Sequence, residues 1–261
     1  MIDHNFKKKF GQNFLQDKNI IKKIANVAET TKDDLIIEVG PGAGALTEEL
    51  VQKSQVLAYE IDQELESNLL DKFKNNDFSL ILDDFLKRDV TKDLESYKYN
   101  NLYVIANLPY YITTPIINKI IDDKLPVQKM VLMVQKEVGE RFSAKIGSKD
   151  YSSITVFLNY YFDIKREFIV SRNAFFPKPN VDSVIISFTK KDNKLKVKNE
   201  ELFFKLIKDS FVQKRKTLKN NLRDYDFSKV EEILVKNNLP IDVRAENISL
   251  DIFVEISNNL S

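Results

Sequence analysis

Three of the six glycines in the chain, Gly40, Gly42 and Gly44, fall within a stretch of five residues. They follow an apolar run that predicts a strand, and they precede a pattern that predicts a helix. Glycine at such a turn lets the backbone bend tightly and lets a ligand approach where a Cβ atom would collide. Glu60 ends the next predicted strand, and an acidic side chain there can accept both hydroxyls of a ribose. The spacing therefore predicts a nucleoside-binding strand–helix–strand unit.

The class of nucleoside ligand stays open at this point. The pattern Gly40-x-Gly42-x-x-Ala45 also satisfies the dinucleotide fingerprint, so a nicotinamide or flavin cofactor is an alternative. A phosphate-cradling P-loop is excluded, because no Gly-Lys-Ser or Gly-Lys-Thr follows. The structural alternative is a strand–turn–helix corner that binds nothing. A second motif is needed to choose among them.

The tetrapeptide Asn107-Leu108-Pro109-Tyr110 directly follows another predicted strand. In an open α/β sheet, ligands bind beyond the carboxyl ends of the strands, so this motif is expected to face the glycine cluster. Asn107 offers a neutral side-chain acceptor, and a residue before proline is held extended and presents its own carbonyl. Two adjacent acceptors suit an exocyclic amine, and Tyr110 offers a face on which a base can stack, worth about 1–3 kcal/mol.

These features suit the methylation of an adenine amine. That amine is a poor nucleophile, because its lone pair is delocalised into the ring. Hydrogen bonds that turn it toward tetrahedral geometry free the lone pair for in-line attack on a sulfonium methyl, so positioning supplies most of the acceleration. The structural alternative for this motif is a proline-capped turn with a surface tyrosine.

The elements that must position these residues alternate between short apolar runs and helical patterns over the first two-thirds of the chain. This alternation is typical of an α/β fold with a mostly parallel sheet. Strands are expected at Asp34–Val39, Val56–Tyr59, Phe78–Leu82, Leu102–Ala106, Val127–Val134, Phe162–Val170 and Asp182–Thr189, the last two as an antiparallel pair. Helices are expected at Ala45–Gln52, Asp62–Lys74, Pro115–Asp122 and Lys136–Phe142.

A strongly polar stretch at Thr189–Lys198 is expected to be a linker. Helical patterns follow it at Glu200–Val212, Arg215–Leu222, Val230–Asn237 and Leu250–Ser257. The sequence therefore predicts two domains, a large α/β domain over residues 1–190 and a small all-α domain over residues 191–261.

Composition excludes several other classes of protein. Among 261 residues there is no cysteine and one histidine, His4, so a disulfide framework, a thiolate zinc site and an iron–sulfur cluster are excluded and no metal is expected. The longest apolar runs, Leu102–Ala106 and Met130–Val134, are too short to span a bilayer. The first residues lack the apolar stretch of a signal peptide. We expect a cytoplasmic protein that does not bind membranes.

The formal net charge of +1 conceals a segregation of charge. The segment Phe211–Arg223 carries five basic residues and no acidic one: Lys214, Arg215, Lys216, Lys219 and Arg223. Residues 224–261 then hold eight acidic and three basic residues, and Lys7–Lys9 form a second basic cluster. A basic stripe attracts phosphates through counterion release, although a solvated helix face is the ordinary alternative.

The chain resembles the KsgA-type small-subunit rRNA adenine dimethyltransferases over nearly its whole length. The matching segments are Phe10–Leu15, Glu38–Gly44, Glu60, Asp84–Leu86, Asn107–Tyr110, Gln135–Val138, Phe176–Ser183, Gln213–Leu218 and Arg244–Asn247. Each is moderately specific alone, and their order makes the resemblance strong. It implies a Rossmann-like S-adenosylmethionine-dependent domain with a mostly parallel seven-stranded sheet, and a helical RNA-binding domain after it.

The resemblance also implies roles for particular residues. The cofactor S-adenosylmethionine would be bound by Gln12, Asn13, Leu15, Gly40, Gly42, Glu60, Ile61, Asp84, Phe85 and Asn107. Within this set Glu60 would hold the ribose hydroxyls and Asp84 the adenine amine, with Asp83 as the nearest rival of Asp84. The catalytic group would be Asn107, Leu108, Pro109, Tyr110 and Phe176, in which Tyr110 and Phe176 sandwich the target base.

The implied activity is dimethylation of two adjacent adenines in small-subunit (16S) rRNA, within a pre-ribosomal particle, by a monomer. Residues 1–30 would form a flap and a helix over the cofactor and the RNA. Two alternatives remain. One is a large-subunit (23S) rRNA adenine methyltransferase of the macrolide-resistance type, and the other is a non-catalytic ribosome-assembly or transcription factor on the same fold.

Overall fold

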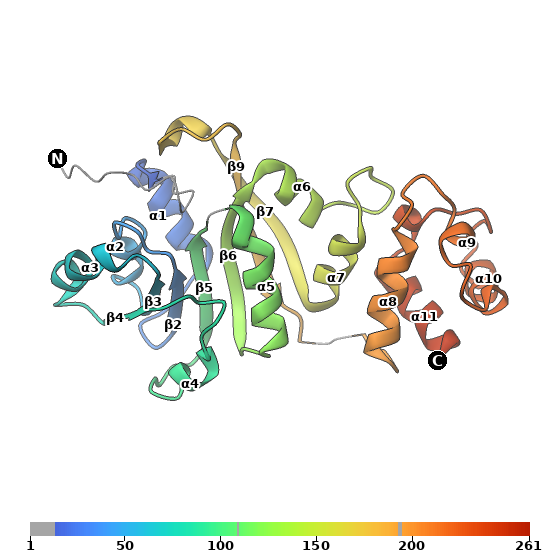
Figure 1. The fold of residues 1–261 in the computed structure, drawn as a ribbon, viewed down its shortest axis with the longest axis horizontal. Helices are drawn as coiled ribbons and strands as arrows, with labels where there is room; N and C mark the ends of the chain where they lie inside the picture. Colours follow the sequence, from blue (N-terminus) through green and yellow to red (C-terminus); the bar gives the residue numbers. More distant parts are fainter. Residues whose placement is uncertain (1–13, 109, 193–194) are drawn as a thin grey trace. The chain divides into compact units, whose positions relative to one another are not determined.

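The structure is a computed structural model that describes residues 14–108, 110–192 and 195–261 (Figure 1). The chain divides into two compact units, one of Met1–Gly139 and Lys165–Thr189, the other of Glu140–Ile164 and Lys190–Ser261. The expected boundary near residue 190 coincides with the last of the three points at which the chain passes between the units, after Thr189. Residues 140–164 were expected in the first domain but group with the second unit, because Tyr151, Val156 and Tyr160 pack into its core.

The first unit is built on a seven-stranded sheet with the strand order β4-β3-β2-β5-β6-β9-β7. Its strands are β2 (Leu35–Val39), β3 (Gln55–Glu60), β4 (Phe78–Leu82), β5 (Leu102–Asn107), β6 (Val127–Gln135), β7 (Phe162–Val170) and β9 (Ser183–Lys190). Neighbouring strands from β4 to β6 are parallel, and β9 is antiparallel to β6. The prediction of a mostly parallel sheet is confirmed.

Helices surround this sheet (Figure 1). They are α1 (Lys18–Val27), α2 (Thr47–Leu50), α3 (Glu66–Phe73), α4 (Val90–Leu94), α5 (Thr113–Asp122) and α6 (Lys136–Phe142). Short 3-10 turns, η2 (Gln63–Leu65) and η3 (Tyr110–Ile112), precede α3 and α5. Side-chain caps fix where two of the helices begin: the Asp17 carboxylate accepts the N–H groups of Asn19 and Ile20, and that of Asp89 accepts the N–H of Lys92.

The core explains why the central strands are apolar on both faces. Every residue of β2 is buried, as expected for a parallel strand covered on each side. On one face Ile36, Ile105 and Met133 pack with buried side chains of α1, α2 and α3. Elsewhere α5 packs against β6 and buries Ile116, Ile117 and Ile120. The sheet is therefore a rigid platform for the loops that follow its strands.

A small second sheet joins the beginning of the described chain to a segment near residue 175. It consists of β1 (Phe14–Leu15) and β8 (Phe175–Phe176), which pair antiparallel, with Phe14 opposite Phe176 and Leu15 opposite Phe175. The main chain of Gln16 extends the contact by donating to the carbonyl of Ala174 at 2.9 Å. Residues far apart in the sequence are thus adjacent here.

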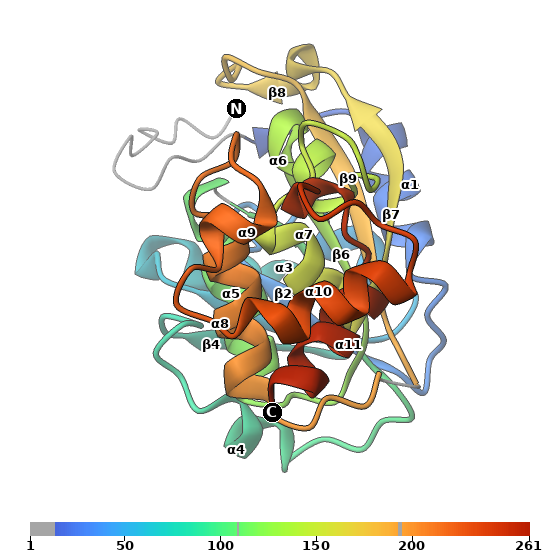
Figure 2. The same cartoon turned by 90° about the vertical axis from the view of Figure 1, so that its right-hand side faces the viewer.

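The second unit is helical. It contains α7 (Ser153–Tyr161), α8 (Glu200–Ser210), α9 (Leu218–Asn221), α10 (Phe227–Lys236), the 3-10 turn η5 (Ala245–Asn247) and α11 (Leu250–Leu260). Helix α11 packs against α10, α8 and α7 (Figure 2). The side chains of Phe203 and Phe253 are fully buried in the core of this unit. The predicted helix Arg215–Leu222 begins later, at Leu218, because the Thr217 side chain caps it.

None of the helices among the described residues is long and apolar enough to cross a membrane.

Candidate active site

Four loops that carry candidate residues follow β4, β3, β2 and β5, which are neighbours in the sheet. These strands are parallel, so their carboxyl ends lie at one edge. The loops surround a cavity of about 320 Å³. Nine of the residues predicted from the sequence line it: Leu15, Gly40, Gly42, Glu60, Ile61, Asp84, Phe85, Asn107 and Leu108.

The glycine loop contributes backbone rather than side chains to the cavity. Gly40, Gly42 and Gly44 all have positive φ, of 69°, 57° and 75°, a region that other residues rarely adopt. A Cβ atom added to Gly40 would meet no heavy atom within 4 Å, so open space lies beside it. A Cβ atom on Gly44 would lie 2.7 Å from the ring of Phe73. The first glycine therefore leaves room for a ligand, and the third lets α3 pack closely.

Glu60 ties the end of β3 to the glycine loop. Its carboxylate accepts the N–H of Gly42 at 3.1 Å, and those of Ile61 and Asp62 at 2.9 and 3.0 Å. The residue is only 3% exposed, although it lines the cavity. A carboxylate has roughly four lone-pair sites, so these three bonds leave capacity for a ligand hydroxyl.

A second buried carboxyl, Glu38, lines the same cavity near the end of β2. Its Oε2 atom accepts the hydroxyl of Thr47 at 2.7 Å. Burial raises the pKa of Glu38 to about 8, and the neighbouring Glu60 carboxylate acts in the same direction. The sequence argument assigned this residue no role of its own.

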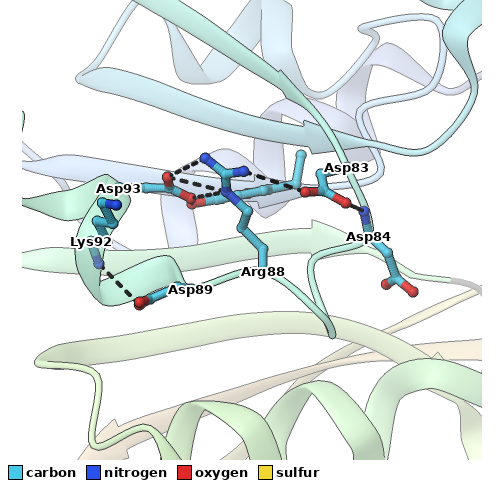
Figure 3. Close-up of polar contacts among 7 residues, drawn as sticks. Asp83, Asp84, Arg88, Asp89, Lys92 and Asp93 are labelled. Carbon is cyan, nitrogen blue, oxygen red and sulfur yellow. Dashed lines mark hydrogen bonds and ion pairs between the residues drawn. The ribbon is translucent and has the colours of Figure 1, made fainter.

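The structure separates Asp84 from its rival Asp83. Both line the cavity, but Asp83 turns toward Arg88, and its Oδ2 lies 3.4 Å from that guanidinium (Figure 3). The Asp84 side chain points away from this pair (Figure 3). Its Oδ1 atom accepts the N–H of Leu86 at 3.0 Å, and its Oδ2 atom lies 3.3 Å from the Lys87 ammonium.

The residues of the tetrapeptide meet the cavity on the neighbouring strand β5. Asn107 is the last residue of that strand and is half-buried, and Leu108 is buried. Tyr110 begins the 3-10 turn η3; the placement of its side chain is not described, and Pro109 lies outside the described residues. Tyr111 also lines the cavity and is 66% exposed.

Phe176 stands apart from the cavity lining. It is 52% exposed on β8, whereas its buried neighbour Phe175 lines the cavity. Gln12, Asn13 and the Lys7–Lys9 cluster lie outside the described residues. The structure thus brings most of the predicted cofactor residues together.

Several lining residues were missed by the sequence argument: Ile21, Ile24, Tyr111, Ile112, Ile116 and Phe175. Two of them lie on α1, where a signal was present. Asp17 precedes apolar residues at helical spacing, Ile20, Ile21 and Ile24, which is the pattern of a capped amphipathic helix. Within the described part of the chain, no group of three or more His, Cys, Asp or Glu side chains could hold a metal ion.

Comparison with known sequences places the chain in one family. The family model described as "Ribosomal RNA adenine dimethylase" matches residues 3–261. A protein of Lactococcus lactis subsp. lactis named Ribosomal RNA small subunit methyltransferase A is 42% identical over 268 residues, covering 99% of this chain and 91% of that protein. The protein of the same name from Streptococcus gordonii is 43% identical over 267 residues, covering 98% of this chain and 92% of that protein.

Solved structures share the fold. The 23S rRNA methyltransferase ErmE superposes with a TM-score of 0.78 at 25% identity, covering 95% of this chain and 99% of that one. A dimethyladenosine transferase from Plasmodium falciparum gives a TM-score of 0.76 at 24% identity, with 93% and 95% covered. These neighbours support the Rossmann-like methyltransferase fold, and identity is far higher to the small-subunit proteins. From the match over residues 3–261 and these identities, the chain belongs to the ribosomal RNA adenine dimethylase family.

Proposed function

We propose that the chain transfers methyl groups from S-adenosylmethionine to the exocyclic amines of two adjacent adenines in small-subunit rRNA, giving N(6),N(6)-dimethyladenosines. The observation that carries this proposal is the position of Asn107. Its strand β5 is the neighbour of β2, so Asn107 and the glycine loop line one cavity. An acceptor for the target amine therefore lies beside a nucleoside-binding loop.

The cavity fits the cofactor in chemical terms. S-adenosylmethionine supplies an electrophilic methyl group on a sulfonium centre when it is bound. The space beside Gly40 would admit its methionine and ribose portion, and Glu60 would accept the ribose hydroxyls. Asp84 would accept from the adenine amine, with Ile61 and Phe85 as apolar lining. Leu15, Gln12 and Asn13 would cover the cofactor from the N-terminal segment.

The chain's own part in catalysis is to hold the target amine. The Asn107 side-chain oxygen and the carbonyls of Leu108 and Pro109 would accept its two N–H groups, turning the nitrogen toward tetrahedral geometry. A neutral amide acceptor suits this task, because a carboxylate in the same place would be attracted to the sulfonium. Orientation of the nucleophile then accounts for most of the rate enhancement.

The target base must leave its stack to reach Asn107, since the amine is inaccessible inside a folded RNA segment. Tyr110 and Phe176 would hold the extruded base between their rings. Support comes from the half-exposed ring of Phe176 on β8, next to the cavity-lining Phe175. An exposed aromatic ring gains burial when a base stacks on it.

The second unit would supply affinity for the RNA backbone. All five basic residues of the segment Phe211–Arg223 are exposed there: Lys214, Arg215, Lys216, Lys219 and Arg223. Exposed cations with few acidic neighbours can bind RNA phosphates, and this releases the counterions condensed on the RNA. Residues 191–261 would thus serve as an RNA-binding domain for a cytoplasmic enzyme that acts as a monomer on a pre-ribosomal particle.

The decisive experiment compares ribosomal particles as substrates. The enzyme is incubated with labelled S-adenosylmethionine and, separately, with small- and large-subunit particles that lack the modification. Label on two adjacent adenines of small-subunit rRNA is the expected result. Label only in large-subunit rRNA would favour an activity like that of the 23S rRNA enzymes. No label on either particle, with RNA binding intact, would favour a non-catalytic factor.

A further inference from the structure

A polar cluster that adjoins the cofactor cavity has no part in the mechanism above. We call it the Arg88 network; it consists of Asp83, Arg88 and Asp93, which Figure 3 labels, and of Tyr59, which is hydrogen-bonded to Asp93. Arg88 grips Asp93 with a fork, from Nε to Oδ2 at 2.9 Å and from Nη2 to Oδ1 at 2.8 Å. Its remaining Nη1 atom reaches Asp83 Oδ2 at 3.4 Å. One guanidinium thus links α4 to the loop after β4.

The network reaches the cavity by two routes. On the first, the Asp83 Oδ1 atom accepts the backbone N–H of Asp84 at 2.8 Å. On the second, the Tyr59 hydroxyl donates to Asp93 Oδ2 at 3.1 Å, and the Tyr59 ring meets the Phe85 ring edge-on, with centroids 5.1 Å apart. Tyr59, Asp83, Asp84 and Phe85 all line the cavity.

The buried carboxylate of Asp93 and the charge of Arg88 make Arg88 the central residue of the network. The Asp93 side chain is 8% exposed, so it depends on the guanidinium for compensation of its charge. Hydrogen bonds from Arg88 hold the pKa of Asp93 below its ordinary range. Burial raises the pKa of Tyr59, so its phenol keeps the proton that it donates to Asp93. Lysine could not reproduce the fork, because its ammonium is a single point of charge.

The Asp84 side chain itself is not part of the Arg88 network. It points away from Arg88, and its Lys87 partner is an exposed ammonium that adds little rigidity (Figure 3). The main chain of Asp84 has two links to the network: its N–H donates to Asp83 Oδ1 at 2.8 Å, and its carbonyl accepts the N–H of Arg88 at 3.1 Å. These two links, together with the bond from the Leu86 N–H to Asp84 Oδ1, fix the direction in which the Asp84 carboxylate leaves the chain.

We propose that Arg88 is a positioning residue for cofactor recognition, which acts through Asp83 to aim the Asp84 carboxylate at the adenine amine. The inference rests on the proposed role of Asp84 as the acceptor of that amine. Arg88 does not touch the cofactor in this account. Its effect is selective: it matters for a ligand that carries the amine and not for one that lacks it.

The test measures the preference for the amine by calorimetry. S-adenosylhomocysteine is compared with S-inosylhomocysteine, in which a carbonyl replaces the adenine amine. The full-length wild type is expected to favour the adenine compound by about 10- to 100-fold, the range for one hydrogen bond to a charged group. Arg88→Gln should reduce that preference to less than about threefold, and Arg88→Lys should give an intermediate value.

Two further variants separate positioning from general stability. Asp83→Ala removes the side-chain link to the Asp84 N–H but leaves the fork between Arg88 and Asp93. It should therefore reduce the preference as Arg88→Gln does. It also decides the matter if Arg88→Gln does not fold. Lys92→Gln, on α4, removes one positive charge as Arg88→Gln does but leaves the network intact. It should keep the preference for the adenine compound within about twofold of the wild type.

The outcomes distinguish the inference from the function on which it rests. If Asp84→Ala keeps the preference for the amine, the proposed role of Asp84 is wrong. If Asp84→Ala abolishes the preference while Arg88→Gln and Asp83→Ala keep it, only the inference about Arg88 is overturned. Equal losses of affinity for both compounds in Arg88→Gln, with a lower melting temperature, would mean that the network is a structural support alone.

Discussion

The proposed cofactor region and the proposed base region differ in how deeply the protein buries their side chains. In the cofactor region, Glu38 and Glu60 are 2% and 3% exposed, and protein donors already occupy part of each carboxyl. In the base region, where the target base is proposed to bind at Asn107 and Phe176, Phe176 is 52% exposed, and Tyr111, which follows Tyr110, is 66% exposed. The cofactor region is thus organised by the fold, whereas the base region would gain its burial from the RNA in the proposed complex.

This difference predicts different costs for substitution. Changes in the cofactor region should alter the stability of the free protein or its affinity for the cofactor, because those groups already have protein partners. Changes in the base region should leave stability within about 0.5 kcal/mol, as for other surface positions, and act on turnover or RNA binding. The following experiments test that contrast.

The largest effect is expected from Glu38, as a dependence of stability on pH. Below its ordinary pKa of 4.5 the carboxyl is protonated whether the chain is folded or unfolded. Between 4.5 and about 8 the unfolded chain releases the proton and the folded chain keeps it. The free energy of unfolding should therefore fall as the pH rises from 4.5 to about 8, by up to about 1.4 kcal/mol per pH unit.

Urea unfolding of the wild type and of Glu38→Gln at pH 5 and pH 8 measures this loss. The variant should lack the decline, because glutamine keeps an acceptor for Thr47 and has no proton to lose. Glu48→Gln is the matched control, since that side chain is 63% exposed, and it should behave like the wild type. Parallel pH profiles for the wild type and Glu38→Gln would contradict the assignment.

The next effect concerns the base region. Asn107→Ala should lower turnover by at least about 100-fold, the cost of deleting one preorganised hydrogen-bonding group. Calorimetry should show that S-adenosylhomocysteine still binds, and the melting temperature should hardly change. Asn118→Ala, a half-buried asparagine on α5, is the control and should turn over normally. Near-normal turnover in Asn107→Ala would rule out this residue as the acceptor of the amine.

Glu60→Ala should weaken binding of S-adenosylhomocysteine by about 10- to 100-fold, because it removes a charged acceptor for the ribose hydroxyls. The same change leaves the N–H of Gly42 without its partner, so some loss of stability should accompany it. Glu66→Ala, an exposed residue that begins α3, serves as the control. An unchanged affinity in calorimetry would place the ribose elsewhere.

Phe176→Ala should raise the KM for the ribosomal particle by about tenfold, within the range for loss of one base–aromatic stack. Cofactor affinity and melting temperature should match the wild type, in contrast to Glu60→Ala. Ile169→Ala, on the half-exposed part of β7, is the control for removing an exposed apolar side chain. A lower melting temperature with an unchanged KM would make Phe176 a structural residue.

The smallest effect is expected in the second unit, at Lys216. Lys216→Gln should weaken binding to small-subunit particles by about fivefold and lower the slope of log affinity against log salt by about 0.7–0.9. Filter binding over a salt series measures both quantities. Lys229→Gln, an exposed lysine on α10, is the control. If the two variants behave alike, the basic segment has no special part in RNA binding.

Much of the first unit was predictable because its signals are local. Most strands of the large sheet are short and largely apolar runs, although β7 carries four charged residues, and all seven strands were expected within a few residues of their observed bounds. Glu60 and Asn107 could be named because they end such runs, and parallel strands present their ends at one edge. The glycine loop followed from residue type alone.

Other parts depend on contacts between distant segments, which no local pattern records. Phe175 enters the cavity because β8 pairs with β1, a register that joins the beginning of the described chain to residue 175. The part of Ile21 and Ile24 in the cavity depends on where α1 packs. Helix α7 was missed because its sequence, rich in aromatic and β-branched residues, favours strand over helix by propensity, and packing overrides that preference.

The path of the chain between its two units limits how the protein can be divided. The chain passes from one unit to the other three times, after Gly139, Ile164 and Thr189. Deletion of the last segment alone would strip Val156 and Tyr160 of the side chains that bury them, leaving apolar surface that promotes aggregation. A chimaera that exchanges the C-terminal region with that of a relative must carry residues 140–164 along with it. The helical region is one compact unit in the folded chain, but its residues come from two separate segments of the sequence.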